Sequence, residues 1–277
     1  MTERSFALLG HPLGHSLSPA LHRLLFALQG DPSPYRLYDA PPDRLEAAVR
    51  HLAAQTAGFN VTIPYKQQIL PLLAQVHGCA AVCGAVNTVA VRPDGLHGYN
   101  TDADGFLYAL HGAGLPLRGR VLLLGSGGAA HVFALLAAQA GADLSVLVRP
   151  GSLARGRALQ AQLTQAVPGA VCRVLTREPE EDFDLLLNAT PVGMFPHTEE
   201  SPVSQALLRR CAGVFDAVYN PRPTRLLQQA AANGSVVCDG LPMLVAQAAA
   251  AQRIWCGYAY TPAQLTEVCR RLAQEAL

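Results

Sequence analysis

Short apolar runs alternate with longer amphipathic segments along the chain. In the first hundred residues, runs rich in β-branched and aromatic side chains predict strands at Phe6–Leu9, Tyr35–Tyr38, Phe59–Val61 and Thr88–Val91. Helical periodicity between these runs predicts helices over Asp43–Gln55 and Pro64–Val76. Such alternation is typical of a layered α/β domain with a largely parallel sheet.

A second alternating series begins near residue 105. Its predicted strands are Val121–Leu124, Leu144–Val148, Cys172–Leu175, Asp184–Asn188 and Val214–Val218. The predicted helices between them include Ala130–Gln139 and Leu153–Ala166. Uninterrupted apolar strands suit a sheet that helices cover on both faces, so we expect a second α/β domain here.

The last two predicted helices, Pro242–Ile254 and Pro262–Ala276, carry proline at or near their first turn, where its missing N–H costs nothing. We expect both helices to return to the first domain, because they follow the second series and still need a surface to pack on. The predicted domains are therefore residues 1–103 with 241–277, and residues 104–240.

Composition narrows the class of protein. The chain has 277 residues and a formal net charge of +1, which offers no basic surplus for nucleic acid. It contains no apolar run of roughly 20 residues, the length that spans a bilayer. The segment Met1–Ser5 lacks the apolar stretch of a signal peptide. We therefore expect a globular, cytoplasmic protein with a small-molecule partner and no nucleic-acid or membrane partner.

The seven cysteines are scattered along the chain. The closest pair, Cys79 and Cys83, has no second pair nearby, whereas a zinc site draws four ligands from tighter clusters. Reduced thiols and no metal are the expectation.

A glycine-rich turn stands between a predicted strand and a predicted helix, and it fits G-x-G-x-x-G/A. Gly125 permits the tight turn, Gly127 lets the backbone approach a pyrophosphate, and the following helix presents free N–H groups to the phosphates. The predicted cofactor residues of this turn are Gly125, Ser126, Gly127, Gly128 and Ala129. The motif predicts a Rossmann-like dinucleotide-binding domain.

The strand after the glycine turn ends at Arg149, and no Asp or Glu occurs from Leu144 to Arg177. An acid at this strand end would bind the ribose 2′-hydroxyl of NAD, whereas an arginine suits the 2′-phosphate of NADP. Ser152, Arg155 and Arg157 are placed to assist. NADP is therefore the expected cofactor, and NAD is the less favoured alternative.

Four polar clusters lie where predicted strands end or turns begin: His15–Pro19, Asn60–Lys66, Gly84–Thr88 and Gly98–Asp102. They supply hydroxyls, amides, one ammonium and one carboxylate, an inventory that suits a small anion with several hydroxyl groups. Each cluster also has a structural interpretation, such as Ser18 acting as a helix N-cap before Pro19.

These clusters and further motifs together resemble shikimate dehydrogenase, in the order in which that family carries them. The matching stretches are Gly10–Pro19, Asn60–Lys66, Gly84–Thr88, Asn100–Asp102, Gly125–Ala129, Asn188–Met194, Asp216–Pro221 and Gly240–Gln247. The resemblance covers nearly the whole chain. It implies a substrate domain and a Rossmann-like domain with the active site in the cleft between them, and reversible reduction of 3-dehydroshikimate by NADPH in aromatic amino-acid biosynthesis.

The resemblance also implies residue roles. Lys66 and Asp102 correspond to the catalytic pair, with Lys66 donating the proton to the ketone oxygen and Asp102 orienting Lys66. The implied substrate-binding residues are Ser16, Ser18, Asn60, Thr62, Asn87, Thr101, Tyr219 and Gln247. The residues expected to border the cofactor are Asn188, Thr190, Met194, Val218 and Gly240.

Alternatives stay open at this point. The family's cofactor loop often reads Asn-Arg-Thr, whereas this chain has Val148-Arg149-Pro150, so a quinate/shikimate dehydrogenase that uses NAD is one alternative. A non-catalytic dinucleotide-binding sensor is another. The expected oligomeric state is a monomer or a homodimer.

Overall fold

The computed structural model describes residues 4–14 and 16–275, so His15 of the first polar cluster and the chain ends lie outside it. The chain divides into two compact units, Met1–Gly105 with Val245–Leu277, and Phe106–Leu244. We call these unit 1 and unit 2. Two helices run from one unit into the other: α4 (Asp102–Gly112) and α9 (Leu241–Cys256).

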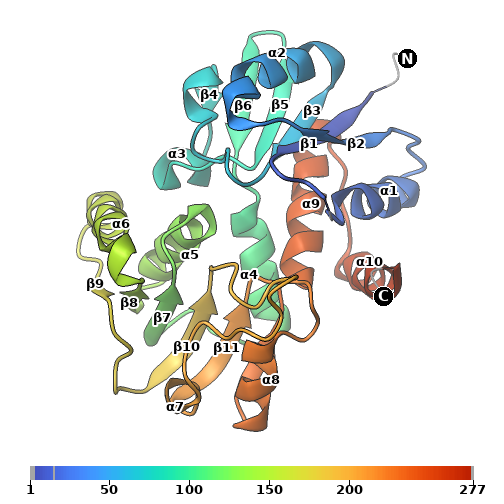
Figure 1. Ribbon diagram of the computed structural model, residues 1–277. Helices are drawn as coiled ribbons and strands as arrows, with labels where there is room; N and C mark the ends of the chain where they lie inside the picture. The colour runs from blue at the N-terminus through green and yellow to red at the C-terminus, as the bar shows by residue number, and fades with distance from the viewer. Residues whose placement is uncertain (1–3, 15, 276–277) are drawn as a thin grey trace. The chain divides into compact units, whose positions relative to one another are not determined.

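Unit 1 contains a six-stranded sheet in the order β2-β1-β3-β5-β6-β4 (Figure 1). Its strands are β1 (Phe6–Gly10), β2 (Tyr35–Asp39), β3 (Gly58–Val61), β4 (Gln75–Val76), β5 (Thr88–Arg92) and β6 (Gly95–Tyr99). Its other helices are α1 (Ser18–Leu28), η1 (Pro42–Arg44), α2 (Leu45–Gln55), η2 (Leu70–Leu72), α3 (Cys79–Cys83) and α10 (Pro262–Glu275).

The sheet of unit 1 is mixed, which corrects the expectation of a largely parallel sheet. β1 runs parallel to both β2 and β3, but β5 runs antiparallel to β3 and to β6. β6 was not among the predicted strands; it follows β5 after a short turn at Pro93 and Asp94. A turn of this length returns the chain antiparallel, because a parallel connection needs a crossover of a dozen or more residues.

Helices cover both faces of this sheet, and the alternation of side chains along β1 decides which residues meet them. Ala7 and Leu9 point toward α2, where Leu52 belongs to the same buried cluster. Phe6 points to the opposite face, where it stacks on Phe26 of α1 at 5.2 Å and on Trp255 of α9 at 4.8 Å. α9 therefore completes the core of unit 1.

The predicted helix Pro64–Val76 is wrong. Residues 63–69 form turns, followed by η2 and then the short strand β4. Pro71 lies in the middle of this stretch and has no N–H, so it interrupts an α-helix there. The turn still buries Tyr65 and Ile69 completely, at 0% exposure each. This burial produced the apolar periodicity that suggested a helix.

Unit 2 contains a six-stranded sheet in the order β12-β11-β10-β7-β8-β9, in which every pairing is parallel. Its strands are β7 (Arg120–Leu124), β8 (Asp143–Leu147), β9 (Cys172–Leu175), β10 (Phe183–Asn188), β11 (Cys211–Asp216) and β12 (Val236–Cys238). Its other helices are α5 (Gly128–Gln139), η3 (Pro150–Ser152), α6 (Leu153–Ala166), α7 (Gln205–Leu208) and α8 (Arg225–Ala232). This is the expected Rossmann-like architecture.

Helices also cover both faces of the sheet in unit 2. Leu207 of α7 and Leu227 of α8 belong to one buried cluster with strand residues on one face. On the opposite face of the sheet, the ring centroid of Phe133 on α5 lies 4.1 Å from that of Phe106 on α4 and 5.6 Å from that of Phe215 on β11. Such coverage explains why the strands are uninterrupted apolar runs. Within the described part of the chain, no helix is long and apolar enough to cross a membrane.

Candidate active site

The polar clusters of unit 1 gather at one edge of its sheet because of strand direction. β1 and β3 are parallel, so Ser16 and Thr62, which follow these strands, lie at the same edge. β5 runs antiparallel to β3, so Asn87, just before β5, lies at that edge too. β6 reverses again, which brings Thr101 and Asp102 there. The antiparallel hairpin that the sequence analysis missed is therefore what assembles the site.

Lys66 and Asp102 form an ion pair at this edge. Nζ of Lys66 lies 2.5 Å from Oδ2 of Asp102, and their side chains are 20% and 8% exposed. The amide of Val86 donates to the carbonyl of Lys66 at 2.7 Å, which fixes the turn that carries the lysine. A partly buried pair of this kind is screened less than a surface pair, so its charges act more strongly on a bound group.

A network of amides and hydroxyls holds the second oxygen of Asp102. Nδ2 of Asn87 donates to Oδ1 of Asp102 at 2.8 Å, and Oδ1 of Asn87 accepts from the backbone N–H of Thr101 at 2.8 Å. The hydroxyl of Thr101 lies 3.4 Å from Oε1 of Gln247 on α9. These residues were predicted from three separate motifs, and the structure connects them.

Asn60 is placed differently from the other predicted substrate residues. Its Nδ2 donates to the carbonyl of Asn87 at 3.0 Å and to the hydroxyl of Thr88 at 2.9 Å. Its Oδ1 accepts from the hydroxyl of Tyr35 at 2.8 Å. Both amide hydrogens are thus used inside the protein, so Asn60 supports the segment that carries Asn87. Its predicted contact with a substrate hydroxyl stays a prediction.

Ser16 and Ser18 lie together at the start of α1. The backbone N–H of Ser18 donates to Oγ of Ser16 at 3.2 Å. Leu17, not Ser18, is the N-cap, and Pro19 lies within the first two helical positions, so the interpretation of Ser18 as a cap is wrong. The hydroxyl of Ser18 has no partner within residues 4–14 and 16–275, nor has that of Thr62. Both are available to a ligand.

Asn100 was not among the predicted site residues, although it belongs to the motif Asn100–Asp102. Its Oδ1 accepts from the backbone N–H of Asp102 at 3.0 Å, and its Nδ2 donates to the carbonyl of Ala85 at 2.8 Å. It therefore ties the start of α4 to the loop before β5. A polar residue two positions before the predicted catalytic acid was the available signal.

The predicted cofactor residues of unit 2 lie at the carboxyl ends of its parallel strands. Gly125 follows β7, Asn188 ends β10, Val218 follows β11, and Gly240 follows β12. The arrowheads of β7, β10 and β11 point the same way in Figure 1. The strand order reverses between β7 and β10, and ligands of open α/β sheets bind at such a switch point.

The glycine turn has the geometry that a dinucleotide needs. Gly125 has a φ of +102°, which side-chain-bearing residues rarely adopt. α5 begins at Gly128, earlier than predicted, and its N-cap residue Gly127 has no side chain with which to cap the helix. The first-turn N–H groups of α5 are thus left for a ligand. A Cβ added to Gly127 would meet nothing within 4 Å in the described structure.

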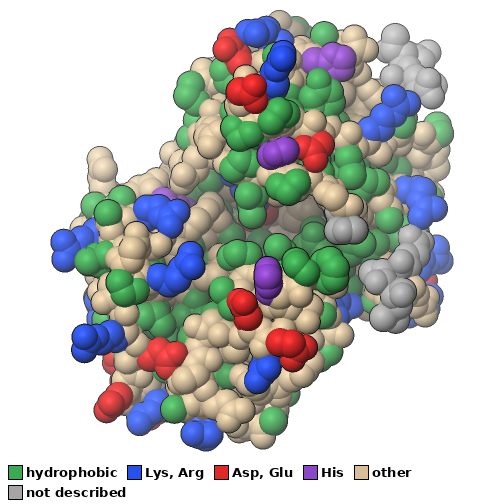
Figure 2. Space-filling model, viewed as in Figure 1, with side chains coloured by type: hydrophobic (Ala, Val, Ile, Leu, Met, Phe, Trp, Pro, Cys, Tyr) green, Lys and Arg blue, Asp and Glu red, His purple; other side chains and the backbone are tan. Residues whose placement is uncertain are grey.

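Lys and Arg side chains gather over α6 in the space-filling view (Figure 2). Arg149 and Arg157 are exposed, and neither makes an ion pair or a side-chain hydrogen bond with any described residue. Nη2 of Arg155 donates to Oγ of Ser152 at 2.8 Å. Free guanidinium groups beside the end of β8 fit an additional phosphate on the cofactor ribose.

Two predicted residues lie apart from these contacts. Met194 is 42% exposed in the segment that follows β10. Tyr219 belongs to unit 2, so the structure does not join it to the substrate residues of unit 1, and its role stays a prediction. Burial raises the pKa of its phenol.

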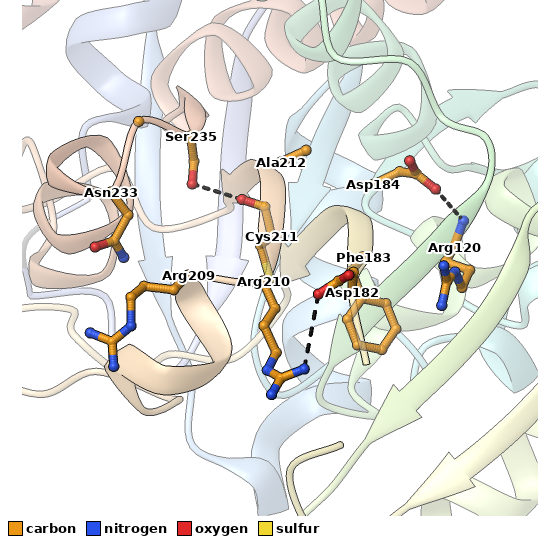
Figure 3. A pocket seen from close by; sticks show the side chains of 11 residues that line it. Arg120, Asp182, Phe183, Asp184, Arg209, Arg210, Cys211, Ala212, Asn233 and Ser235 are labelled. Atoms are coloured by element: carbon orange, nitrogen blue, oxygen red, sulfur yellow. Dashed lines mark hydrogen bonds and ion pairs between the residues drawn. The ribbon is translucent and has the colours of Figure 1, made fainter. Parts of the chain in front are cut away.

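A hollow of about 480 Å³ on unit 2 lies at the opposite edge of the sheet (Figure 3). Its lining includes Arg120, Phe183 and Cys211, which are the first residues of β7, β10 and β11. It is therefore separate from the glycine turn. No three His, Cys, Asp or Glu side chains of the described chain lie close enough to hold a metal ion.

Comparisons with known proteins agree with this geometry. Residues 8–89 match the family described as "Shikimate dehydrogenase substrate binding domain". The shikimate dehydrogenase (NADP(+)) of Symbiobacterium thermophilum is 40% identical over 264 residues, which is 92% of this chain and 89% of that protein.

Solved structures cover the chain equally well. The chorismate mutase/shikimate 5-dehydrogenase fusion protein of Clostridium acetobutylicum has a TM-score of 0.91 and 29% identity, covering 100% of this chain and 99% of that one. The shikimate 5-dehydrogenase of Thermus thermophilus, in complex with NADP(H) and shikimate, has a TM-score of 0.87 and 37% identity, covering 97% and 99%. The chain belongs to the shikimate dehydrogenase family.

Proposed function

We propose that this chain catalyses the reversible, NADPH-dependent reduction of 3-dehydroshikimate to shikimate. The observation that carries the proposal is the ion pair of Lys66 and Asp102 within a network of amides and hydroxyls. Membership of the family supports the reaction, and the free Arg149 supports NADP over NAD. We place the enzyme in the cytoplasm, as a monomer or a homodimer; the lack of a disulfide among the described cysteines supports this location.

Unit 2 fits the cofactor. The amides at the start of α5 would bind the pyrophosphate, and Arg149 with Arg155 would bind the 2′-phosphate. NADPH, when bound, supplies the hydride. Thr190, Val218 and Gly240 stand at neighbouring strand ends and would border it.

Unit 1 would hold the substrate. Ser16 and Ser18 donate to its carboxylate, while Thr62, Asn87 and Thr101 bind its hydroxyls. Asn87 gives one amide hydrogen to Asp102 and has a second one for a substrate oxygen. Hydroxyl and amide donors at fixed positions give discrimination, because an analogue that lacks a hydroxyl leaves them unpaired.

Lys66 donates and accepts the proton of the reaction. When hydride adds to the ketone carbon, the oxygen gains negative charge, and the ammonium of Lys66 both stabilises this oxygen and donates a proton to it. The carboxylate of Asp102 holds Nζ in place through its Oδ2. In the oxidative direction, Lys66 accepts the hydroxyl proton of shikimate.

The direct test is the loss of nicotinamide absorbance when NADPH and 3-dehydroshikimate are mixed with the enzyme. Shikimate and quinate, each with NADP and NAD, complete a four-way assay. Turnover fastest with shikimate and NADP is the expected result. Faster oxidation of quinate with NAD would favour the alternative branch of the family, and NADPH binding without turnover would indicate a sensor.

A further inference from the structure

A completely buried carboxylate in unit 2 has no role in the steps above. Asp216 ends β11, and its exposure is 0%. Its Oδ1 accepts from Nδ2 of Asn188 at 2.9 Å and from the backbone N–H of Val218 at 3.0 Å. Its Oδ2 accepts from the hydroxyl of Thr224 at 2.7 Å. Within the described chain, its bonding partners are all neutral.

Such a group is costly to bury. Desolvation raises the pKa of Asp216 from 3.8 to about 6, even though three donors stabilise the charged form. A buried charge without a cation needs a compensating reason to be present. A simple core position would be served by an apolar residue of similar volume.

The bonds of Asp216 reach the loops that follow three strands. The other side-chain atom of Asn188, Oδ1, accepts two hydrogen bonds from Thr190. The backbone N–H of Thr190 donates at 3.0 Å and the hydroxyl of Thr190 at 2.7 Å. The carbonyl of Val218 accepts from the N–H of Gly240 at 3.2 Å. The loops after β10, β11 and β12 are thus joined through one carboxylate.

One of these loops touches the glycine turn directly. The Cγ2 of Thr190 lies 2.9 Å from the position that a Cβ on Gly125 would occupy. The side chain of Thr190, oriented by Asn188, therefore forms the wall against which the turn rests. A shift of Asn188 would therefore displace Thr190 and remove the contact that Thr190 makes with the turn at Gly125.

We propose that Asp216 is a positioning residue for NADPH, which holds Thr190 and Val218 in the arrangement that the cofactor requires. The proposal rests on the proposed function, because it assumes that unit 2 binds NADPH. Asp216 itself is buried and would not contact the cofactor. Its action runs through Asn188 to the loop after β10 and through Val218 to the loops after β11 and β12.

The hydrogen-bond pattern predicts which substitutions are tolerated. In Asp216→Asn, Oδ1 still accepts from Nδ2 of Asn188 and from the N–H of Val218, and only the hydroxyl of Thr224 loses its carboxylate acceptor. In Asp216→Ala, all three donors lose their acceptor, and Asn188 is free to rotate away from Thr190. The alanine variant should therefore fail where the asparagine variant succeeds.

The experiment measures the Kd of NADPH by nicotinamide fluorescence, together with the KM of each substrate, for the full-length variants. Asp216→Ala should raise the Kd and the KM of NADPH about tenfold or more. The KM of shikimate should be unchanged, and so should kcat at saturating cofactor. Asp216→Asn should restore the Kd to within about threefold of the wild type.

The control is Ser145→Ala. Ser145 is equally buried, at 0% exposure, and its hydroxyl accepts from Nε of Arg173 on β9 at 2.7 Å, so it has no bond to the loops that Asp216 joins. This variant should lower stability without changing the Kd of NADPH. If Asp216→Ala does not fold, Asp216→Ser retains one acceptor and should give an intermediate Kd.

Three outcomes overturn the inference. These are a wild-type Kd in Asp216→Ala or Asp216→Ser, an equal loss in Ser145→Ala, and a parallel rise in both KM values. Failure of the wild-type enzyme to bind NADPH is a different result, since it overturns the proposed function as well.

Discussion

The ammonium of Lys66 and the carboxylate of Asp102 are 2.5 Å apart, although 36 positions separate the two residues in the chain. The turn after β3 carries the lysine, and the start of α4 carries the aspartate. Asn87 and Asn100 hold Asp102 from two sides, so the pair is oriented before any ligand binds. This preorganisation is the basis of the first prediction.

Removing either charge should lower kcat much more than it changes KM. Lys66→Ala and Asp102→Asn should each lower kcat about 10²- to 10⁴-fold, the usual contribution of a positioned proton donor, with a modest change in KM. The measurement is initial rates over a range of 3-dehydroshikimate concentrations. Asp104→Asn is the matched control, because Asp104 lies on the same helix and pairs with Arg253 at 2.8 Å on the exposed surface. An unchanged kcat in Lys66→Ala would refute its role.

Arg149 should determine the preference for NADP. Arg149→Ala removes a free guanidinium, and charged hydrogen bonds of about 1.5–3 kcal/mol correspond to a roughly 10- to 150-fold rise in the KM of NADPH. The KM of NADH should change little, because NADH lacks the 2′-phosphate. Arg120→Ala is the control, since Arg120 lines the hollow at the opposite edge of the sheet. Equal changes for both cofactors would remove Arg149 as the phosphate reader.

Gly127 should be required for the cofactor but not for the fold. An alanine there meets no described atom within 4 Å, so Gly127→Ala should change the free energy of unfolding by less than about 0.5 kcal/mol. The added methyl group would stand where the pyrophosphate approaches, so the Kd of NADPH should rise about tenfold or more. Gly112→Ala, also at an open position but at the end of α4, should leave the Kd of NADPH unchanged. Thermal unfolding and fluorescence titration of the two variants test this pair of expectations.

His22 should make unit 1 less stable in acid. Burial lowers its pKa from 6.5 to about 3, since its ring stacks on Tyr35 and its Nδ1 lies 3.0 Å from Nε2 of Gln252. As the pH falls through 6.5, His22 becomes protonated in the unfolded chain, whereas in the folded chain it stays neutral down to about pH 3. The free energy of unfolding should therefore fall by about 1.4 kcal/mol per pH unit from this group alone within that window.

Urea unfolding at pH 5 and at pH 7.5 measures the effect. His22→Phe keeps the stacking but cannot take up a proton, so its stability should depend less on pH than that of the wild type. His51→Gln is the control for the loss of a histidine, because the side chain of His51 is exposed whereas that of His22 is buried. Identical pH dependence in His22→Phe and the wild type would contradict the expectation.

Local sequence determined much of the fold. The strand β7, the glycine turn and α5 follow one another directly, so the expected strand–turn–helix unit depends on contacts between near neighbours only. The parallel strands of unit 2 are buried on both faces and therefore read as continuous apolar runs. The prediction of a helix over Pro64–Val76 was wrong for a local reason as well. It followed the apolar periodicity of this stretch and gave too little weight to Pro71, which interrupts an α-helix.

Only the tertiary structure decided how the polar motifs combine. The antiparallel pairing of β5 and β6 brings Asn87, Thr101 and Asp102 to the edge where Lys66 stands, and hydrogen bonds then join them. It also decided that Asn60 uses both amide hydrogens internally, and that Asp216 joins three loops. A sequence shows which donors and acceptors exist. Which of them satisfy one another depends on distances across the sheet, and those are fixed only when the strands pair.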